Sequence, residues 1–381
     1  MKIPVLLVST AARWIGTARI PAALAKAGFA VTLLTPTNSL AEKSRFVSKI
    51  GYLPDNATVP QWIVAFAGAV KESAPRIVVP CDDMAFRLLS MLVRSPPEQM
   101  QPSLQLELAA LIRDSLGDPA YYDASVDKTQ FPSAAEALGV RVPPYSIVSN
   151  PAAAEAFAAT HGYPLVLKRA HGFAGQGVAI CANHDDLTRA FAKFSQPQPL
   201  DDPGPPRFLV QAHVPGRVQY YLATAWQGCL LAGIAGEKVV SNPEPTGPPT
   251  VVRYFRAPQL RAIAASLAAG FNISGHFFVE FLASAGTDVP LALEINRRIM
   301  PGSHRGRDRN VDQWAALYAR LTGTVSPSRT DLDEGEEGIV VWFPGEWLRD
   351  PESRYLREYV VDVPWDEPDL IEALLATRHE Q

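Results

Sequence analysis

Cysteine is scarce in this sequence, which has three cysteines in 381 residues. Cys81, Cys181 and Cys229 lie far apart, without a CxxC pair or the spacing of zinc ligands. This pattern argues against a disulfide framework and a structural zinc site, and it is typical of a protein from a reducing compartment. We therefore predict a cytoplasmic protein.

Charge and long apolar runs are also limited. Charged residues make up 19% of the chain, and 35 basic against 39 acidic side chains leave a net charge of −4. Such a chain has no overall basic field to hold nucleic acid or an anionic membrane. No stretch approaches the ~20 apolar residues that cross a bilayer, and the run Val5–Val8 is too short for the core of a signal peptide. We expect neither a nucleic-acid nor a membrane partner.

Short apolar segments alternate with helical patterns in the first 100 residues. Strands are expected over Pro4–Val8, Phe29–Leu34 and Arg76–Pro80, and helices over Ile15–Ala27 and Gln61–Ser73. Continuous apolar strands that alternate with helices are typical of a parallel sheet covered on both faces. The sequence thus predicts an α/β chain that begins with a βαβ-type parallel-sheet domain over residues 1–125.

The turn after the first strand does not carry a dinucleotide-binding fingerprint. Ser9–Gly16 lacks the GxGxxG pattern, so we expect this domain to wall a cleft rather than to bind a dinucleotide. Asp82 and Asp83 follow the strand that ends at Pro80, at the edge where open sheets often bind ligands. Aspartates in this position more simply cap the next helix, and both interpretations stay open.

Two lysines and a glycine-rich loop mark the middle of the chain. Lys128 stands at the start of a helix expected over Asp127–Leu138, where a lysine is commonly solvated. Lys168 ends the apolar strand Pro164–Lys168, and a lysine there is costly unless it meets an anion. The loop Gly172–Gly177 would let backbone N–H groups approach phosphate oxygens closely. By itself this loop fits a hairpin without a ligand equally well.

A further strand ends in an X-Pro-Gly segment. The strand pattern stops at Gln211–Val214, and Pro215 and Gly216 follow. Backbone groups freed at such an end could pair with an adenine edge, and the alternative is an ordinary strand-to-turn transition.

The strongest signal is a pair of carboxylates inside apolar strand patterns. Glu280 and Glu294 lie on either side of the turn Ser284–Asp288, so the two strands can pair and bring the carboxylates side by side. Asn296 shares one face of its strand with Glu294, because side chains alternate along a strand. Two carboxylates and an amide oxygen form a site suited to Mg²⁺. The alternative is that the carboxylates are neutralised by an arginine, which would be Arg253, Arg297 or Arg298.

In this order the features resemble the ATP-grasp superfamily, as in carbamoyl-phosphate synthase, biotin carboxylase and D-alanine–D-alanine ligase. The resemblance runs from Asp127 to Arg298, and residues 1–125 resemble the α/β domain that commonly precedes this fold. It implies a two-subdomain α+β ATP-grasp fold. The small subdomain is expected over residues 126–210, the C-terminal subdomain with the metal site over residues 211–325, and a tail of open role over residues 326–381.

The resemblance also implies a role for each matching residue. The residues implied to bind ATP belong to two phosphate-binding lysines, a flexible loop and an adenine hinge, and they are Lys128, Lys168, Gly172, Gly175, Gln176, Gly177, Gln211, Ala212, His213 and Val214. The implied ligands of magnesium are Glu280, Glu294 and Asn296. Two Mg²⁺ ions are expected, with Mn²⁺ as an alternative. The implied catalytic residues are Lys168 and the motif arginine, Arg298.

Two positions depart from the family pattern. Arg297 replaces the proline of the E-x-N-P-R motif, and we expect it to add positive charge next to the phosphate site. The ribose-binding glutamate of the family has no acidic counterpart after the hinge, and Gln219 is the nearest substitute. Because an amide can hydrogen-bond ribose hydroxyls, we expect Gln219 to contact the nucleotide, with the nucleotide preference left open.

The resemblance implies a ligase that uses ATP and Mg²⁺ to convert a small carboxylate into an acyl phosphate, which an amine then attacks. By resemblance, the segment Gly236–Arg256 crosses the face opposite the nucleotide. The cations expected to hold an anionic substrate, there and in a loop after the motif, are Lys238, Arg253, Arg256, His304 and Arg305. The alternatives are activation of bicarbonate, as in carboxylases, and an ATP-binding protein that has lost catalysis. Many relatives are dimers, so a homodimer is expected.

Overall fold

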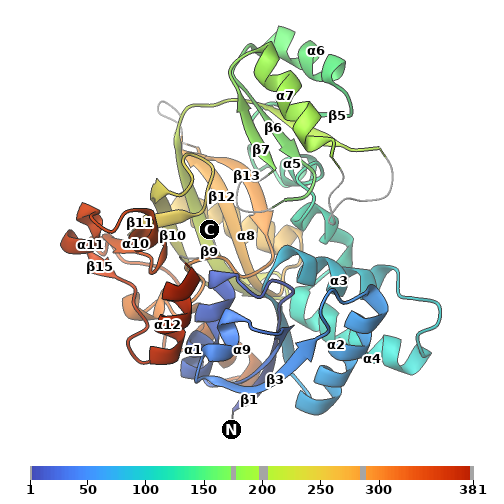
Figure 1. Cartoon of the computed structure of the whole chain (residues 1–381), viewed down its shortest axis with the longest axis vertical. Coiled ribbons are helices and arrows are strands. Elements are labelled where there is room, and N and C mark those ends of the chain that lie inside the picture. Colours follow the sequence, from blue (N-terminus) through green and yellow to red (C-terminus); the bar gives the residue numbers. More distant parts are fainter. Residues whose placement is uncertain (1, 173–176, 197–204, 284–288, 378–381) are drawn as a thin grey trace.

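The computed structural model describes residues 2–172, 177–196, 205–283 and 289–377. Its N-terminal part is built on a sheet of four parallel strands in the order β3-β2-β1-β4 (Figure 1). The strands are β1 (Ile3–Val8), β2 (Phe29–Pro36), β3 (Val47–Leu53) and β4 (Ile77–Pro80). The helices and 3₁₀ turns are α1 (Ile15–Ala27), η1 (Leu40–Lys43), α2 (Val59–Ser73), α3 (Asp83–Arg94), α4 (Pro102–Leu116), η2 (Pro119–Tyr121) and η3 (Asp123–Ser125).

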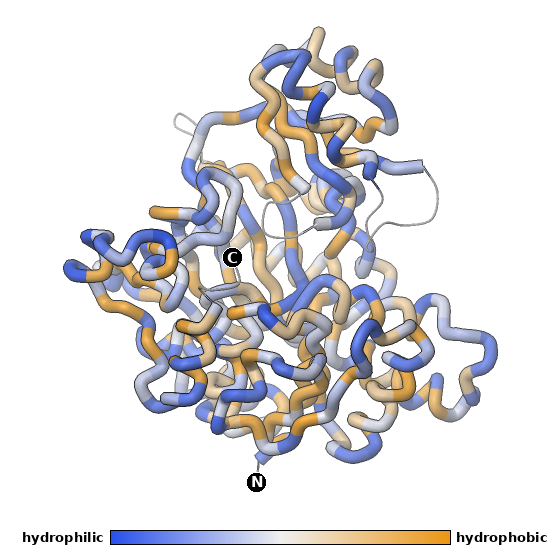
Figure 2. The backbone as a smooth tube through the Cα atoms, viewed as in Figure 1, coloured by the Kyte–Doolittle hydropathy of each residue, from blue (hydrophilic) through white to orange (hydrophobic). Residues whose placement is uncertain are grey.

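Both faces of this sheet are buried, which explains its continuous apolar strands. Val5 and Leu7 of β1 point into a core shared with α1 and with Trp314 of a helix that comes much later in the chain. Leu6 and Val8 point into a second core, shared with α2, α3 and α4. The predicted parallel α/β domain is therefore confirmed, and apolar residues follow its strands in Figure 2.

The end of α1 shows why glycine is needed at residue 28. Gly28 adopts φ 114°, the left-handed conformation that caps the helix, and its N–H reaches back to the carbonyl of Leu24 or Ala25. A Cβ atom there would lie 2.8 Å from Cε2 of Tyr318. Both the backbone conformation and the close approach of the ring therefore favour glycine.

A small antiparallel sheet, in the order β5-β8-β6-β7, follows the N-terminal domain and stands at the top of Figure 1. Its strands are β5 (Tyr145–Val148), β6 (Leu165–Arg169), β7 (Val178–Cys181) and β8 (Phe208–Ala212). The helices of this part are α5 (Phe131–Glu136), α6 (Pro151–His161) and α7 (His184–Phe194), and α6 and α7 share a core with the sheet. The hairpin expected around the glycine-rich loop is present as β6 and β7.

The largest sheet has seven strands in the order β13-β12-β9-β10-β11-β14-β15. They are β9 (Arg217–Trp226), β10 (Cys229–Ser241), β11 (Pro249–Phe255), β12 (Gly275–Ala283), β13 (Leu291–Asn296), β14 (Gly338–Val341) and β15 (Val360–Val361). The accompanying helices are α8 (Pro258–Gly270), η4 (Arg307–Arg309), α9 (Gln313–Thr322), α10 (Gly345–Arg349), α11 (Arg354–Glu358) and α12 (Pro368–Ala376). Within the described ranges, no helix has the length and apolar character to cross a membrane.

The C-terminal segment is an integral part of this architecture. Strand β14 pairs with β11 and so extends the seven-stranded sheet. Helix α12 packs against α1 and η1 through Leu370 and Leu374, and α12 and α1 lie beside one another in Figure 1. Asp362 accepts hydrogen bonds from Arg19 of α1 and lies 2.7 Å from Nε2 of His304. The tail thus connects the first helix to the large sheet.

Candidate functional site

A cavity of about 320 Å³ lies where the small sheet faces the large one. Its walls come from β6, β7 and β8 on one side and from β9, β10, β12 and β13 on the other. Trp14 of the N-terminal domain and Trp342 of the tail also line it. The N-terminal domain, the small sheet, the large sheet and the tail therefore all contribute to one cavity.

The two predicted metal-binding carboxylates lie side by side in this cavity. Strands β12 and β13 are antiparallel, and their register places Glu280 directly opposite Glu294. Asn296 donates a hydrogen bond from Nδ2 to Oε1 of Glu294 over 3.0 Å. The expected pairing of the strands is confirmed, and the turn Ser284–Asp288 that joins them lies outside the described residues.

Lysines, rather than the three arginines considered above, neutralise the carboxylates. Nζ of Lys128 lies 3.3 Å from Oε2 of Glu294 and also donates to the carbonyl of Gly172 over 2.9 Å. Lys238 forms a close ion pair with Glu280. Lys168 lines the same cavity and is 6% exposed. Three lysines thus surround two carboxylates, which leaves one excess positive charge for an anion.

The titration of this cluster follows from burial and charge. Burial lowers the pKa of Lys168, although Glu294 opposes this effect. Burial alone would raise the pKa of Glu294, but Lys128, Lys168 and the hydrogen bond from Asn296 lower it to about 2. Glu294 is therefore ionised at neutral pH, as a metal ligand must be.

The donor set fits a hard cation such as Mg²⁺. Glu280 and Glu294 offer carboxylate oxygens, and Asn296 uses its amide nitrogen toward Glu294, which leaves its oxygen as a further donor. No group of three or more His, Cys, Asp or Glu side chains placed to hold a metal occurs in the part of the chain that the structure describes.

The other residues predicted to bind the nucleotide divide into three groups. Gly172 and Gly177 line the cavity, whereas Gly175 and Gln176 lie outside the described residues. Four hinge residues line the cavity as well, and they are Gln211, Ala212, His213 and Val214. Gln219 does not line it.

The hinge retains one free backbone donor. The N–H groups of Ala212 and His213 donate to the carbonyls of Pro144 and Pro164 over 2.9 and 3.2 Å. The N–H of Val214 has no hydrogen-bond partner among the described residues. This arrangement leaves the Val214 amide available to a ligand in the cavity.

The expectation for Gln219 is corrected by the structure. Val218 and Tyr220 line the cavity, so the alternation of β9 turns Gln219 to the opposite face of the sheet. There its Nε2 donates to Oε2 of Glu237 over 2.8 Å, and both side chains are buried. Gln219 therefore does not contact a ligand in the cavity.

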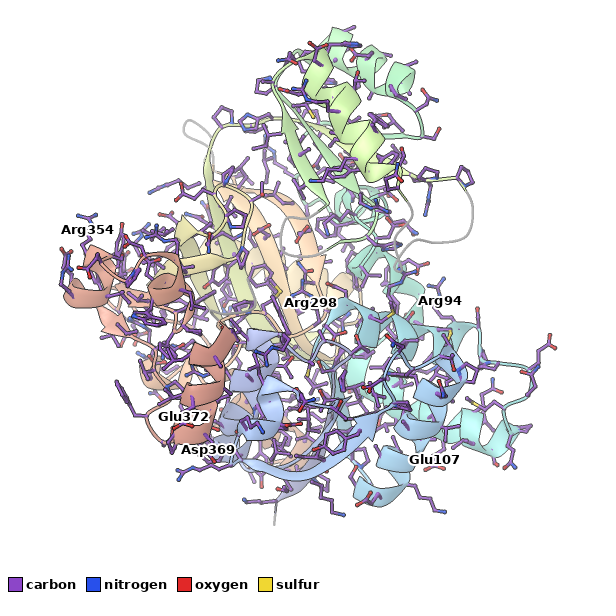
Figure 3. All side chains as sticks on the ribbon, in the orientation of Figure 1. Arg94, Glu107, Arg298, Arg354, Asp369 and Glu372 are labelled. Carbon is purple, nitrogen blue, oxygen red and sulfur yellow. The ribbon has the colours of Figure 1, made fainter. Side chains whose placement is uncertain are left out.

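Arg298 and Arg297 point to opposite faces as well. Arg298 lines the cavity, its Nε donates to Oδ2 of Asp83 over 2.9 Å, and its guanidinium lies 5.4 Å from the ring centre of Trp14. It is labelled in Figure 3 where the N-terminal domain meets the large sheet. Arg297 is 2% exposed and donates to the carbonyls of Leu116 and Ser274. The expectation that Arg297 adds charge beside the phosphates is thus wrong, and burial lowers the pKa of its guanidinium to about 10.

The cations expected to hold a substrate on β10 and β11 are also placed differently. Lys238 lies in the cavity itself, paired with Glu280. Arg253 is on the opposite face, where it pairs with Glu237 and Glu337.

The remaining substrate candidates are engaged elsewhere. Arg256 forms an exposed ion pair with Glu334. His304 and Arg305 both contact Asp362, as part of the connection between the tail and α1. These residues are structural contacts of the tail and the surface, because none of them lines the cavity.

Asp83 was left open between ligand binding and helix capping, and two tryptophans of the cavity were not identified from the sequence. Asp83 pairs with Arg298, while its neighbour Asp82 caps α3 and binds the hydroxyl and backbone N–H groups of Ser9–Ala11. Trp14 and Trp342 line the cavity. The tail is rich in tryptophan, but the sequence does not predict where Trp342 lies. Its position follows from the pairing of β14 with β11.

Comparison with known proteins gives consistent matches. A family model described as the ATP-binding domain of the carbamoyl-phosphate synthase L chain matches residues 127–200. The carbamoyl phosphate synthase large chain of Xanthomonas axonopodis pv. citri (strain 306) is 28% identical over 194 residues, which are 47% of this chain and 17% of that protein. The arginine-specific large chain of Cutaneotrichosporon cutaneum is 25% identical over 206 residues, or 52% of this chain and 17% of that protein. The match thus spans about a sixth of the length of these relatives.

Solved structures resemble the whole architecture. The ADP complex of N5-carboxyaminoimidazole ribonucleotide synthetase has a TM-score of 0.64 at 15% identity, and the match covers 87% of this chain and 80% of that one. Biotin carboxylase from Campylobacter jejuni has a TM-score of 0.64 at 16% identity, with 86% and 72% covered. The family model over residues 127–200, these relatives and the shared folds all indicate similarity to the ATP-grasp superfamily.

Proposed function

We propose that this protein is an ATP- and Mg²⁺-dependent ligase that activates a small carboxylate as an acyl phosphate for attack by an amine. One observation carries the proposal: Glu280 and Glu294 face one another in a cavity, and three lysines surround them. Phosphoryl transfer needs positioning and neutralisation of charge more than covalent help from the protein. This cluster offers both.

The residues would act in the following way. Glu280, Glu294 and Asn296 hold the cation, which when bound supplies charge neutralisation at the phosphate oxygens. Lys128 and Lys238, released from the two carboxylates, turn to the phosphates together with Lys168. Their positive charge stabilises the negative charge that develops during transfer.

The proposed reaction needs no nucleophilic side chain from the protein. A carboxylate oxygen of the substrate attacks the γ-phosphorus, and the bond to ADP breaks. The amine nitrogen then attacks the acyl carbon, phosphate leaves, and the amine loses one proton. Gly172 and Gly177 line the cavity in which this transfer would take place.

Bicarbonate is a second candidate for the activated carboxylate. The observation that favours it is the likeness to biotin carboxylases, one of which was solved with MgADP and bicarbonate, at a TM-score of 0.61 and 15% identity. Bicarbonate would occupy the position proposed for the small carboxylate, beside Lys238 and Arg298. It would be phosphorylated in the same way before reaction with the amine.

Release of ADP tests the proposal. Purified protein with Mg·ATP would be given small carboxylic acids, bicarbonate and amines, singly and in pairs. We expect ADP with one acid and amine pair, and a loss on the order of 100-fold or more in the Glu294→Gln variant. Glu334→Gln, at an exposed ion pair on the surface, is the control and should keep full activity.

The outcomes separate the candidates. ADP that depends on bicarbonate would select the second candidate. ATP binding without ADP release from any combination would contradict the ligase and leave a nucleotide-binding protein without catalysis.

A further inference from the structure

The N-terminal domain holds the segment that follows strand β13. Arg298 and Ile299 come shortly after Asn296, the last residue of that strand. The N–H of Ile299 donates to the carbonyl of Pro80, at the end of β4, over 3.2 Å. The carbonyl of Ile299 accepts a hydrogen bond from the indole N–H of Trp14, also over 3.2 Å. The backbone beside Arg298 is thus fixed at two points by the N-terminal domain.

The side chain of Arg298 is held by the same domain. Its Nε donates to Oδ2 of Asp83, in the first turn of α3, over 2.9 Å. Its guanidinium lies 5.4 Å from the ring centre of Trp14. The side chain of Arg298 is only 5% exposed, and that of Asp83 is 17% exposed. An arginine held by an ion pair and an aromatic face has little freedom to reorient, because its guanidinium is planar and rigid.

One nitrogen of Arg298 stays open. Nε is taken by Asp83, and Nη1 donates to the carbonyl of Ile299 and lies close to the sulfur of Met300. Nη2 has no hydrogen-bond partner among the described residues, and it is not one of the side-chain atoms that are fully buried without a partner. Because Arg298 lines the cavity, Nη2 is the nitrogen that can meet a ligand there. The N–H groups of a fixed cation form strong hydrogen bonds to an oxyanion.

The carboxylate of Asp83 is free from the task of capping α3. That task belongs to Asp82, whose side chain accepts a hydrogen bond from the N–H of Ala85. Asp83 instead lines a small cavity of about 10 Å³ that Glu294 and Asn296 also line. The pair of Asp83 and Arg298 therefore adjoins the residues that are proposed to hold the cation.

We propose that Asp83 is a positioning residue, which binds Nε of Arg298 and so orients the guanidinium with Nη2 toward an oxyanion in the cavity. The oxyanion is a phosphate group or a substrate carboxylate, since both present charged oxygen atoms. Asp83 acts through Arg298 and does not touch the reacting atoms. Its effect on catalysis rests on the proposed ligase function, whereas the orientation of the guanidinium does not.

Two other roles of Asp83 would give different results. If the ion pair were only structural, its removal would lower stability and leave kcat unchanged. If Asp83 acted only through its charge, its removal would strengthen anion binding and raise kcat. A positioning role lowers kcat when Asp83 is removed although anion binding is not weakened, because the donor is no longer aligned with the reacting group.

The orientation of Arg298 can be measured by NMR without turnover. The protein would be labelled with isotopic nitrogen in its arginines, and the Nε–H signal of Arg298 would be assigned by its absence in Arg298→Lys. Inorganic phosphate and acetate would be added separately, with Mg·ADP present. We expect a wild-type signal that exchanges slowly with water. A shift of this signal by phosphate identifies a phosphate group as the oxyanion, and a shift by acetate identifies a carboxylate.

Substitution of Asp83 then tests its role. Asp83→Ala should abolish the slowly exchanging signal and lower kcat for ADP release about 10-fold or more, while the anion binds at least as tightly because a neighbouring negative charge is lost. Asp83→Asn keeps an oxygen of the same reach and should restore part of the signal and of kcat. Asp114→Ala removes a carboxylate of the same domain from an exposed ion pair with Arg76, and as the matched control it should change neither.

An unchanged Arg298 signal in both Asp83 variants would overturn the inference, as would a wild-type signal that neither anion shifts. ADP release with the same kcat in Asp83→Ala and wild type would uphold the ligase and contradict the positioning role. If no acid and amine release ADP, loss of the signal in Asp83→Ala together with a shift by one anion in the wild type would uphold the orientation and contradict only the ligase.

Discussion

At the scale of single residues, two neighbouring arginines perform opposite tasks. Arg298 lies in the cavity beside Asp83, and Arg297 lies on the other face, where it donates to the carbonyls of Leu116 and Ser274. Successive side chains of an extended segment point in opposite directions, so one of these neighbouring arginines lines the cavity and the other is buried away from it.

Replacing these arginines should separate the two tasks. Arg297→Ala leaves two buried carbonyls short of a donor, and we expect a loss of about 2 kcal/mol or more in the free energy of unfolding, with the KM for ATP unchanged. Arg298→Ala should instead abolish most ADP release. Urea unfolding and kinetics would be compared with Arg320→Ala, an exposed arginine on α9. A raised KM for ATP in Arg297→Ala would contradict the structural role.

His276 of β12 makes stability depend on pH. Burial and the charge of Arg297 lower its pKa from 6.5 to about 3, so the folded protein keeps it neutral while the unfolded chain takes up a proton below pH 6.5. Stability is therefore lost as the pH falls from 6.5 toward 3, and at pH 5 this residue costs about 2 kcal/mol relative to pH 8.

Urea unfolding at pH 8 and pH 5 measures this effect. We expect His276→Gln to lessen the decrease between the two pH values, because glutamine takes up no proton. His184→Gln, at a histidine whose side chain is 67% exposed, should leave the decrease as it is. An equal decrease in wild type and His276→Gln would contradict the assignment.

At the scale of elements, the sequence pattern predicted most of the strands and the pairing at the site. Helix α1 and the strands β1, β2 and β4 follow from apolar runs, and the hairpin β12–β13 from two strand patterns around a turn. The helix expected over Asp127–Leu138 is shorter, Phe131–Glu136, and Asp127 lies in the turn before it, where its carboxylate accepts hydrogen bonds from Thr129, Gln130 and Arg207.

The sequence pattern could not predict which face of the sheet each side chain points to in strands that are buried on both faces. Gln219, Arg253 and Arg297 all lie on the face away from the cavity. A strand with two buried faces lacks the alternation of polar and apolar residues that would show which face meets the ligand. The contribution of Trp342 depended on a contact between β14 and β11, which are far apart in sequence.

The tail and α1 form one connected element through Asp362. Burial alone would raise the pKa of this carboxyl, but Arg19 and His304 hold it well below its usual range. Asp362→Ala leaves Arg19 buried without its counter-charge and removes one of the two carboxylates that pair with Arg305, and we expect a loss of about 3 kcal/mol in the free energy of unfolding. Asp366→Ala removes a half-exposed pair with Lys26 and should cost less than about 1 kcal/mol. Equal effects of the two variants in urea unfolding would contradict the connection.

At the scale of the whole molecule, the cavity is assembled from every part of the chain. The small sheet supplies Lys168 and Gln211, the large sheet supplies the two glutamates, and the N-terminal domain and tail supply one tryptophan each. The tail therefore contributes a residue to the cavity in addition to its contacts with α1.

The measurement that tests the account most directly is the affinity for ATP, with and without Mg²⁺, by calorimetry. Wild type and the double variant Glu280→Gln/Glu294→Gln would be compared, since the variant keeps all three lysines. We predict that Mg²⁺ raises ATP affinity at least about 10-fold in the wild type, and that the variant binds ATP with little dependence on Mg²⁺. The role assigned to the glutamates would be contradicted if the wild type did not bind ATP. It would also be contradicted if Mg²⁺ changed the ATP affinity of both proteins equally.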